Sequence, residues 1–471
     1  MGMPNVLADR YATEEMVQLF DPTNRIIVER EFWLAVLEAQ IDLVGIAPRT
    51  VLDDYRSVLH TVDLNSIRDR DRAVRHDVKA RIDEFNALAG HEHIHKGLTS
   101  RDLTENVEQA ITLQALKLVE SRTVALLARI AERSAEYAAV AMAGRTHNVA
   151  AQPTTVGKRL AMFGAELLLA YRRLLDLLER QQLRGLKGAV GSQSDLLALL
   201  GSAENVKTLE QRVAQGLGFQ DTLDVVGQVY PRSIDYEVVA TLLQLASGPA
   251  NLALAIRLMA GHDLATEGFQ EGQVGSSAMP HKMNTRSSER IGGFHTILKG
   301  HLTMAAGLTG DQWNEGDVSC SVVRRVLIPD AFFAIDGLYE TAFSVVADFG
   351  VFPAVVSQEL ERYLPFLSTT ALLMHAVNQG IGREQGHHII RQHALSAAAS
   401  MREGQGDGQA LLIALGNDEQ FPGDYEDLLA ISANAIETIG TISEQIGSFC
   451  SEVATIAAGR TDATYGGRFV I

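Results

Sequence analysis

The segment Gly275–Asn284, which reads GSSAMPHKMN, combines side chains that can bind a carboxylate and remove a proton beside it. Ser276 and Ser277 supply hydroxyl groups, and Lys282 supplies a positive charge. Glycines in and before the segment allow a tight backbone whose amide groups come close to a ligand. Ligand-binding groups are often carried on loops held by a rigid scaffold. We therefore interpret this segment as part of an active site rather than as a polar surface loop.

Four further segments place imidazole, guanidinium or hydroxyl groups close to predicted turns or helix ends. They are Arg75–Asp77 (RHD), His95–Asp102 (HKGLTSRD), Gly144–Asn148 (GRTHN) and Ser321–Arg325 (SVVRR). Each segment alone is typical of a capped helix end or a solvated charge cluster. Five such segments in a chain of formal net charge −17 favour one composite site for a polyanionic substrate.

Other chemistries fit the sequence less well. His91, His93 and His95 resemble metal ligands, but only the first and last would share a face of a helix, and no third ligand is specified. We therefore predict no metal site. The chain has no phosphate-binding loop of the GxxxxGK[ST] type and no nucleophile elbow of the GxSxG type. The glycines of Gly185–Gly188 lack the spacing of a dinucleotide-binding turn.

Composition narrows the class of protein further. A net charge of −17 disfavours a nucleic-acid partner, because such binders usually present a basic face. The two cysteines, Cys320 and Cys450, cannot build a disulfide framework, which fits a reducing cytosol. The first ten residues lack the apolar stretch of a signal peptide. We expect a cytoplasmic protein.

One uncharged stretch, Val238–Ile256, is as long as a membrane span. Polar and helix-disrupting residues interrupt it, among them Gly248, Pro249 and Asn251. A buried helix kinked near Gly248–Pro249 explains this pattern better, so no membrane partner is expected.

The elements that must position these residues are predicted to be helices. Proline is scarce, and apolar residues recur at helical spacing over Arg25–Val44, Lys158–Arg180, Asp235–Leu264 and Ser287–Leu308. No alternation typical of strands has useful length, so the fold class is all-α. Thr99 or Ser100 could cap a helix that follows Asp102.

Three regions are predicted along the chain. They are an N-terminal helical domain (1–103), a central long-helix bundle with the loop 268–284 (104–357), and a C-terminal helical domain (358–471) that ends in an irregular tail (459–471). Long helices with broad apolar stripes need neighbours, which predicts a homo-oligomer.

The segment Gly275–Asn284 resembles the signature of the fumarase/aspartase superfamily, whose members cleave C–N or C–O bonds by β-elimination and release fumarate. Within it, Met279–Lys282 (MPHK) resembles the adenylosuccinate lyase family. Further segments agree in the same order: Arg10–Tyr11, RHD at 75–77, HKGLTSRD at 95–102, GRTHNVAAQPTT at 144–155 and GQVYPRS at 227–233. The resemblance runs from about residue 5 to residue 370.

This resemblance implies an all-α, three-domain subunit with a long central helical bundle. It implies a homotetramer in which each active site draws residues from three subunits. The substrates would be small succinylated purine nucleotides: adenylosuccinate, split to AMP and fumarate, and SAICAR, split to AICAR and fumarate. The resemblance implies no cofactor, whether metal or organic.

The resemblance also implies a role for individual residues. Ser276 would be the base, with Ser277 as the alternative, and Lys282 would stabilise the serine oxyanion. His147 would be the general acid, with Glu289 orienting it, and His76 would assist near the leaving group or the phosphate. The remaining substrate-binding set would comprise Arg10, Tyr11, Arg75, Asp77, His95, Thr99, Ser100, Gln228, Met283, Asn284, Ser321 and Arg325.

Three positions depart from the family pattern. Thr285 stands where proline is usual and Asn148 where glycine is common. Arg324 stands where an acidic residue often precedes the arginine, and we expect it to add positive charge near a phosphate. None of the three removes a catalytic group.

Two alternatives stay open. The 3-carboxymuconate cycloisomerases share the MPHK signature, although the RHD and GQVYPRS segments favour a nucleotide substrate. A non-catalytic structural role, like that of the lens crystallins of this superfamily, predicts the loss of a catalytic group. Ser276, His147, His76 and Lys282 are all present.

Overall fold

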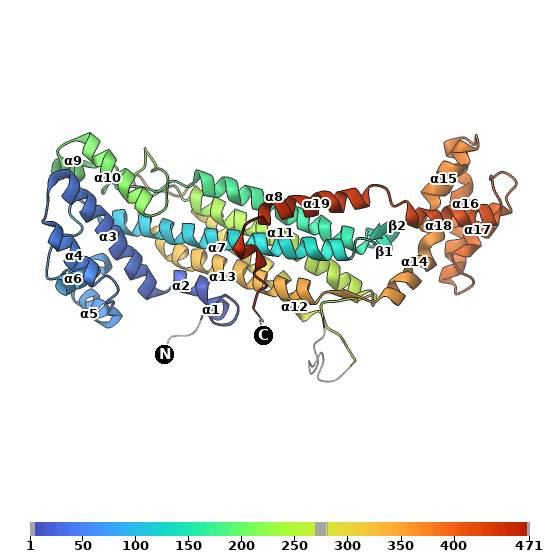
Figure 1. Ribbon diagram of the computed structural model, residues 1–471, viewed down its shortest axis with the longest axis horizontal. Coiled ribbons are helices and arrows are strands. Elements are labelled where there is room, and N and C mark those ends of the chain that lie inside the picture. The colour runs from blue at the N-terminus through green and yellow to red at the C-terminus, as the bar shows by residue number, and fades with distance from the viewer. Residues whose placement is uncertain (1–4, 269–278, 280, 469–471) are drawn as a thin grey trace.

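Long helices make up most of the chain, as the periodicity predicts, and they form an elongated molecule (Figure 1). This computed structural model describes residues 5–268, 279 and 281–468. The N-terminal helices are α1 (Val6–Arg10), α2 (Glu14–Leu19), α3 (Pro22–Val44), α4 (Arg49–Ser57), α5 (Leu64–Val74) and α6 (Asp77–Ala89). The predicted helix over 25–44 is thus confirmed as α3. Asp21 caps its start ahead of Pro22, and Gly45 ends it in a left-handed conformation.

The middle of the chain contributes the longest helices and all the short strands. The helices are α7 (Ser100–Glu136), α8 (Val156–Arg180), α9 (Ser194–Leu200), α10 (Ala203–Gly216), α11 (Ser233–Ala260), α12 (Arg286–Leu308) and α13 (Ser319–Asp348). The strands are β1 (Ala141–Thr146), β2 (Val149–Thr155), β3 (Ala265–Thr266) and β4 (Gly350–Val351).

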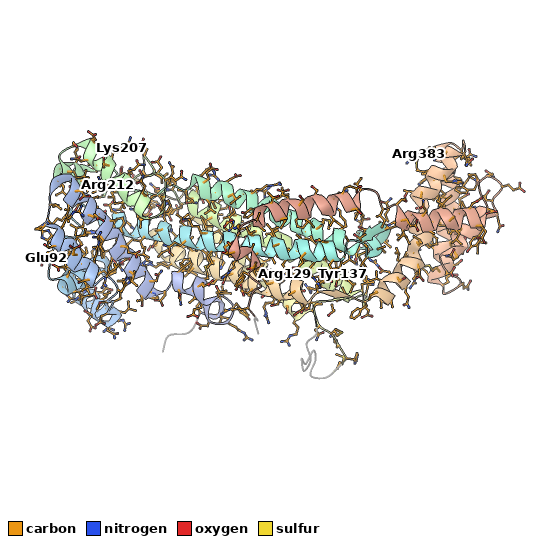
Figure 2. The ribbon with its side chains drawn as sticks, viewed as in Figure 1. Glu92, Arg129, Tyr137, Lys207, Arg212 and Arg383 are labelled. Carbon is orange, nitrogen blue, oxygen red and sulfur yellow. The ribbon has the colours of Figure 1, made fainter. Side chains whose placement is uncertain are left out.

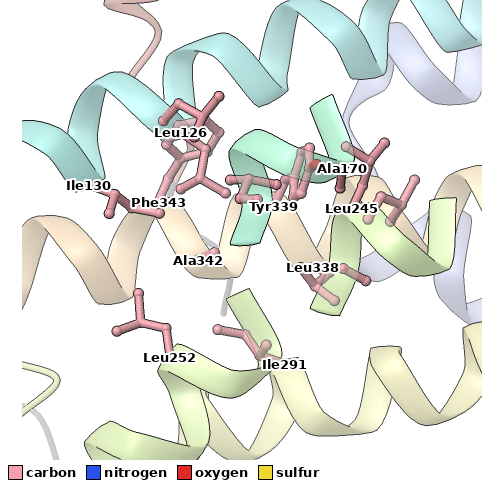
Figure 3. Close-up of a cluster of buried hydrophobic side chains, with 14 of the residues drawn as sticks. Leu126, Ile130, Ala170, Leu245, Leu252, Ile291, Leu338, Tyr339, Ala342 and Phe343 are labelled. Atoms are coloured by element: carbon pink, nitrogen blue, oxygen red, sulfur yellow. The ribbon is translucent and has the colours of Figure 1, made fainter. Parts of the chain in front are cut away.

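A bundle of α7, α8, α11, α12 and α13 forms the core of the molecule. Figure 3 shows side chains from all five helices meeting in one apolar layer, among them Leu126, Ala170, Leu245, Ile291 and Tyr339. Within each helix, apolar residues recur at the spacing that places them on one face. The bundle therefore forms a rigid axis on which the predicted site segments are mounted.

Helix α11 contains the uncharged stretch predicted to be a buried helix. It is the one described helix that is long and apolar enough to cross a membrane by length and composition, and 56% of its most apolar window is buried inside the protein. It continues through Pro249. At Gly248 a β-carbon would lie 2.8 Å from the carbonyl oxygen of Phe163, so glycine allows α11 to approach α8 closely.

The all-α class is confirmed, with one local correction. The segment GRTHN, which we predicted to lie near a turn or a helix end, forms the turn of an antiparallel hairpin between β1 and β2, two strands that the sequence did not predict. His147 and Asn148 have φ values of 52° and 61°, which fit a two-residue hairpin turn. The register shifts between Gly144 and Arg145. Two short strands with this irregularity lack the regular alternation by which strands are recognised in a sequence.

The C-terminal helices are α14 (Pro353–Leu367), α15 (Thr369–Asn378), α16 (Arg383–Arg402), α17 (Gln409–Gly416), α18 (Tyr425–Glu437) and α19 (Ile442–Ala457), followed by the 3₁₀ turn η1 (Thr461–Thr464). Helices α14 to α18 form one end of the molecule, and α19 returns along α7 and α8 (Figure 1).

Three main hydrophobic clusters lie along the molecule. One follows the bundle, and one lies among α15, α16, α17 and α18. The third joins α3, α4, α6 and the start of α7 to α9 and α10, which come much later in the chain. The division into domains at residues 103 and 357 stays a prediction. The third cluster shows that α9 and α10, from the middle of the chain, pack against the N-terminal helices.

Candidate active site

His76 and Ser100 bring the N-termini of two helices together. The His76 side chain caps α6, since its Nδ1 accepts a hydrogen bond from the backbone amide of Lys79 at 3.3 Å. Its Nε2 lies 3.4 Å from the Oγ of Ser100, the first residue of α7. Helix N-termini carry free amide groups and a partial positive charge. This corner is therefore suited to an anion, and the roles of His76, Thr99 and Ser100 toward substrate stay predictions.

The carboxylate of Asp102 fixes the start of α7 through hydrogen bonds on both of its oxygens. Its Oδ2 accepts a hydrogen bond from the Thr99 amide at 2.8 Å, which completes a capping box. Its Oδ1 accepts bonds from Arg184 at 2.5 Å and from the Lys187 and Gly188 amides at 2.9 and 3.0 Å. The carboxylate is fully buried. The aspartate of the TSRD segment thus positions Thr99 and Ser100, whose role in substrate binding stays a prediction.

His95 lies deeper in the same corner, with a left-handed backbone. The indole Nε1 of Trp33 donates a hydrogen bond to its Nδ1 at 3.0 Å, which requires that nitrogen to be unprotonated. Burial lowers the pKa of His95 to about 4, although the nearby Asp102 opposes this shift. His95 is therefore neutral at pH 7.

Asp77 and Arg325 connect this corner to α13. Burial opposes the ionisation of Asp77, but the positive charges of Arg81 and Arg325 help to lower its pKa. Ser321 lies one turn before Arg325 on α13, and Gln228 packs against Gly316 just before that helix. Arg75 ends α5 and is exposed. Residues expected to bind the nucleotide thus gather from α5, α6 and α13.

Arg324 requires a correction. Its guanidinium is buried and bonds Glu108, Asp235 and the hydroxyl of Tyr230. The Nε to Asp235 Oδ2 distance is 2.7 Å. The expectation that it adds positive charge near a phosphate was wrong, because these carboxylates compensate its charge.

The second group of site residues follows the loop and begins α12. A cavity of about 810 Å³ is lined by Lys282, Met283, Asn284 and Glu289, together with His281, the end of α11 and the start of α14. Ser276 and Ser277 lie outside the described residues, so the base stays a prediction. Lys282 and Glu289 are exposed within this one chain.

Glu267, which sequence reasoning missed, anchors the start of α12. Its buried carboxylate accepts bonds from the Ser287 and Ser288 amides, each at 2.8 Å, and from the Ser288 hydroxyl at 2.7 Å. It thereby ties the chain before the loop to the helix after it. The sequence offers no local signal for this bond, because the partners lie twenty positions apart.

Arg10 and Tyr11 lie against α12. The Tyr11 ring packs edge-on against Phe294, with ring centroids 5.1 Å apart. Arg10 and Arg290 each lie 5.7 Å from the centroid of the Tyr11 ring. Burial lowers the pKa of Arg290, and Arg10 and Arg286 lower it further. Sequence reasoning missed Arg286 and Arg290, whose spacing of four residues on one helix face was the available signal.

His147 forms the third group, exposed at the turn of the β1–β2 hairpin. Arg145 donates a hydrogen bond to the Asn148 carbonyl at 3.1 Å and pairs with Glu359 of α14. The described contacts do not join His147 to Glu289, so that pairing stays a prediction. Figure 1 shows the hairpin and α6 at opposite ends of the bundle, so one chain alone does not bring His147 and His76 together.

Comparison with known proteins places the chain among lyases. Residues 19–296 match the family described as lyase. The adenylosuccinate lyase of Saccharomyces cerevisiae is 32% identical over 430 residues, covering 90% of this chain and 89% of that protein. The adenylosuccinate lyase of Schistosoma mansoni is 31% identical over 451 residues, covering 94% and 93%.

Solved structures share the architecture. A fumarate lyase from Mesorhizobium sp. BNC1 matches with a TM-score of 0.79 and 20% identity, covering 94% of this chain and 98% of that one. A 3-carboxy-cis,cis-muconate lactonizing enzyme from Pseudomonas putida matches with a TM-score of 0.80 and 19% identity, covering 96% and 100%. At such identities these likenesses show the fold alone. The family match and the sequence relatives show that the chain belongs to the lyase family and, within the fumarase/aspartase superfamily, to the adenylosuccinate lyases.

Proposed function

We propose that this protein is a carbon–nitrogen lyase of purine nucleotide biosynthesis that splits adenylosuccinate into AMP and fumarate, and SAICAR into AICAR and fumarate. The observation that carries the proposal is the meeting of two helix N-termini at His76 and Ser100, beside Asp77 and Arg325. Such a corner suits an anionic nucleotide. The similarity to two enzymes named adenylosuccinate lyase, along most of the chain, supports this substrate class.

The reaction needs a base, an acid and a carboxylate-binding group. In our proposal, the Ser276 hydroxyl, as its oxyanion, takes a proton from the carbon beside a succinyl carboxylate. The electron pair delocalises into that carboxylate, where fixed donors such as Lys282 and Asn284 stabilise the added charge. The C–N bond then breaks, and His147 protonates the departing nitrogen. Fumarate and the purine nucleotide leave as products.

We also propose that the complete site is shared between subunits of a homotetramer. His76, His147, Lys282 and Glu289 are exposed in the single chain, and the first two are mounted at opposite ends of the bundle. A second chain running antiparallel along the first would bring one end of each bundle beside the other. This arrangement would enclose groups that a single chain leaves in water.

A second candidate function is lactonisation of a carboxymuconate. The specific observation in its favour is the MPHK signature at Met279–Lys282, which resembles that of the 3-carboxymuconate cycloisomerases. The sequence relatives favour the first candidate, because they match at higher identity than the Pseudomonas putida enzyme does.

One substrate panel separates these candidates. Purified protein is incubated with adenylosuccinate, SAICAR, argininosuccinate and 3-carboxymuconate, and each product is followed by chromatography. We expect turnover of the first two compounds only. Turnover of 3-carboxymuconate without turnover of either purine compound would replace the proposal, and no turnover of any of them would favour a structural role.

A further inference from the structure

The C-terminal strap, defined as residues 459–468, crosses the bundle and reaches the segment between α1 and α2, next to Arg10 and Tyr11. Figure 1 shows the strap running from the end of α19 toward α1 and α2. Arg460, the second residue of the strap, binds Glu120 of α7 through two hydrogen bonds of 2.6 and 2.7 Å. The sequence predicted only an irregular tail here, with no function attached.

Glu340 of α13 is the anchor of the strap. This carboxylate is fully buried, and its two oxygens accept bonds from the Tyr465 hydroxyl at 2.7 Å and the Arg468 amide at 2.6 Å. The Tyr465 ring packs edge-on against Phe343, at a centroid distance of 5.3 Å, and beneath the guanidinium of Arg122. Burying a carboxylate costs free energy of folding unless its oxygens accept hydrogen bonds. The strap supplies these hydrogen bonds to Glu340 and so stabilises the bundle.

The strap then contacts the backbone between α1 and α2. The Arg468 guanidinium donates a hydrogen bond to the carbonyl of Ala12. The next amide, that of Thr13, donates to Asp336 at 2.5 Å, and Asp336 lies one helical turn before Glu340. Ala12 and Thr13 are both buried. The peptide that directly follows Tyr11 is therefore held from two sides, by the strap and by α13.

We propose that the strap positions Arg10 and Tyr11 for substrate binding, with Arg468 and Tyr465 as positioning residues. This inference rests on the proposed function for the part that concerns substrate. Tyr11 packs against Phe294 on one side, and a β-carbon on Gly337 would lie 2.9 Å from the Cβ of Tyr11. Since Tyr11 fits this tightly, a small displacement of Ala12 moves both side chains expected to hold the nucleotide.

The test compares Arg468→Ala and Tyr465→Phe with the unmodified full chain. We expect KM for adenylosuccinate to rise about tenfold in Arg468→Ala, with kcat changed less than about twofold, because binding rather than chemistry is affected. Arg468→Lys keeps a donor for the Ala12 carbonyl and should recover most of the affinity. Arg383→Ala is the matched control, because Arg383 is exposed at the start of α16, at the end of the molecule that α14 to α18 form (Figure 2).

Hydrogen exchange supplies a readout that does not depend on activity. Amides from Thr13 to Val17 should exchange about tenfold faster in Arg468→Ala than in the unmodified protein or in Arg383→Ala. Unchanged exchange would overturn the proposal that the strap holds the segment after Tyr11. Faster exchange with unchanged KM would overturn the proposal that this contact affects substrate binding. If the unmodified protein fails to cleave adenylosuccinate, the proposed function fails, while exchange still decides whether the strap holds the corner.

Discussion

Single residues of the candidate site differ in how tightly the fold constrains their protonation. His95 is half-buried and accepts a hydrogen bond from Trp33, whereas His147 is exposed at a hairpin turn. A buried neutral imidazole can bind a substrate but cannot gain a proton readily. An exposed imidazole can exchange protons with solvent or substrate, as a general acid must. The different roles that we propose for His95 and His147 are consistent with these surroundings.

His95 predicts a pH dependence of stability. Its pKa falls from 6.5 to about 4 on folding, so below pH 6.5 the unfolded chain binds a proton that the folded chain does not. Stability is therefore lost as pH falls through this range, by about 2 kcal/mol at pH 5. His95→Gln should lose about 2 kcal/mol less than the unmodified protein between pH 7 and pH 5. Urea unfolding at both pH values measures this difference, and equal losses would contradict it.

His147 predicts a loss of catalysis without a loss of structure. His147→Asn is the preferred change, because asparagine tolerates the left-handed backbone that this position adopts. Loss of a general acid should lower kcat by about 100- to 10,000-fold, with the thermal midpoint unchanged because the side chain is exposed. Turnover within about tenfold of the unmodified enzyme would contradict the assignment of His147 as the acid.

At the scale of elements, the β1–β2 hairpin depends on α14 for its position. Arg145 pairs with Glu359 of α14 and also donates to the Asn148 carbonyl at the turn. Ala143 of β1 packs against Leu360 and Leu367 of α14. The C-terminal helices therefore determine where the His147 turn points. If His147 is the acid, as we propose, a region without predicted catalytic residues contributes to the site in this way.

Glu359→Gln tests this dependence. The change keeps the size of the side chain but removes the charge that holds Arg145, so the turn should lose its fixed orientation. We expect kcat to fall about tenfold, with a smaller change in KM. Glu361→Gln, on the same helix but exposed and bonded only locally to Ser357, is the control. Equal activity of the two variants would show that the ion pair does not position the turn.

At the scale of the whole molecule, the elongated bundle separates residues that the proposed reaction needs together. The His76 corner and the His147 turn lie at opposite ends of the helical bundle of one chain (Figure 1). A rigid helical core cannot bend to join them. Assembly of several chains is therefore the physical route by which this fold could complete the site.

Subunit complementation tests this route. His147→Asn and Ser276→Ala chains, each inactive alone, are unfolded together and refolded in equal amounts. If a site takes these residues from different subunits, roughly a quarter of the sites should regain both, because each position is intact in half of the chains. Activity near a quarter of the unmodified level supports shared sites. No recovery, with tetramers present by light scattering, would indicate that both residues come from one chain.

The sequence by itself determined the long helices and the fold class, and it predicted the site segments. Helical periodicity over Lys158–Arg180 and Asp235–Leu264 is a local property, and α8 and α11 follow it closely. Tertiary structure alone decided the pairing of Arg324, the anchoring of α12 by Glu267 and the docking of the tail on Glu340. Each of these depends on partners distant in the chain, and buried charges choose such partners through three-dimensional packing that no local pattern encodes.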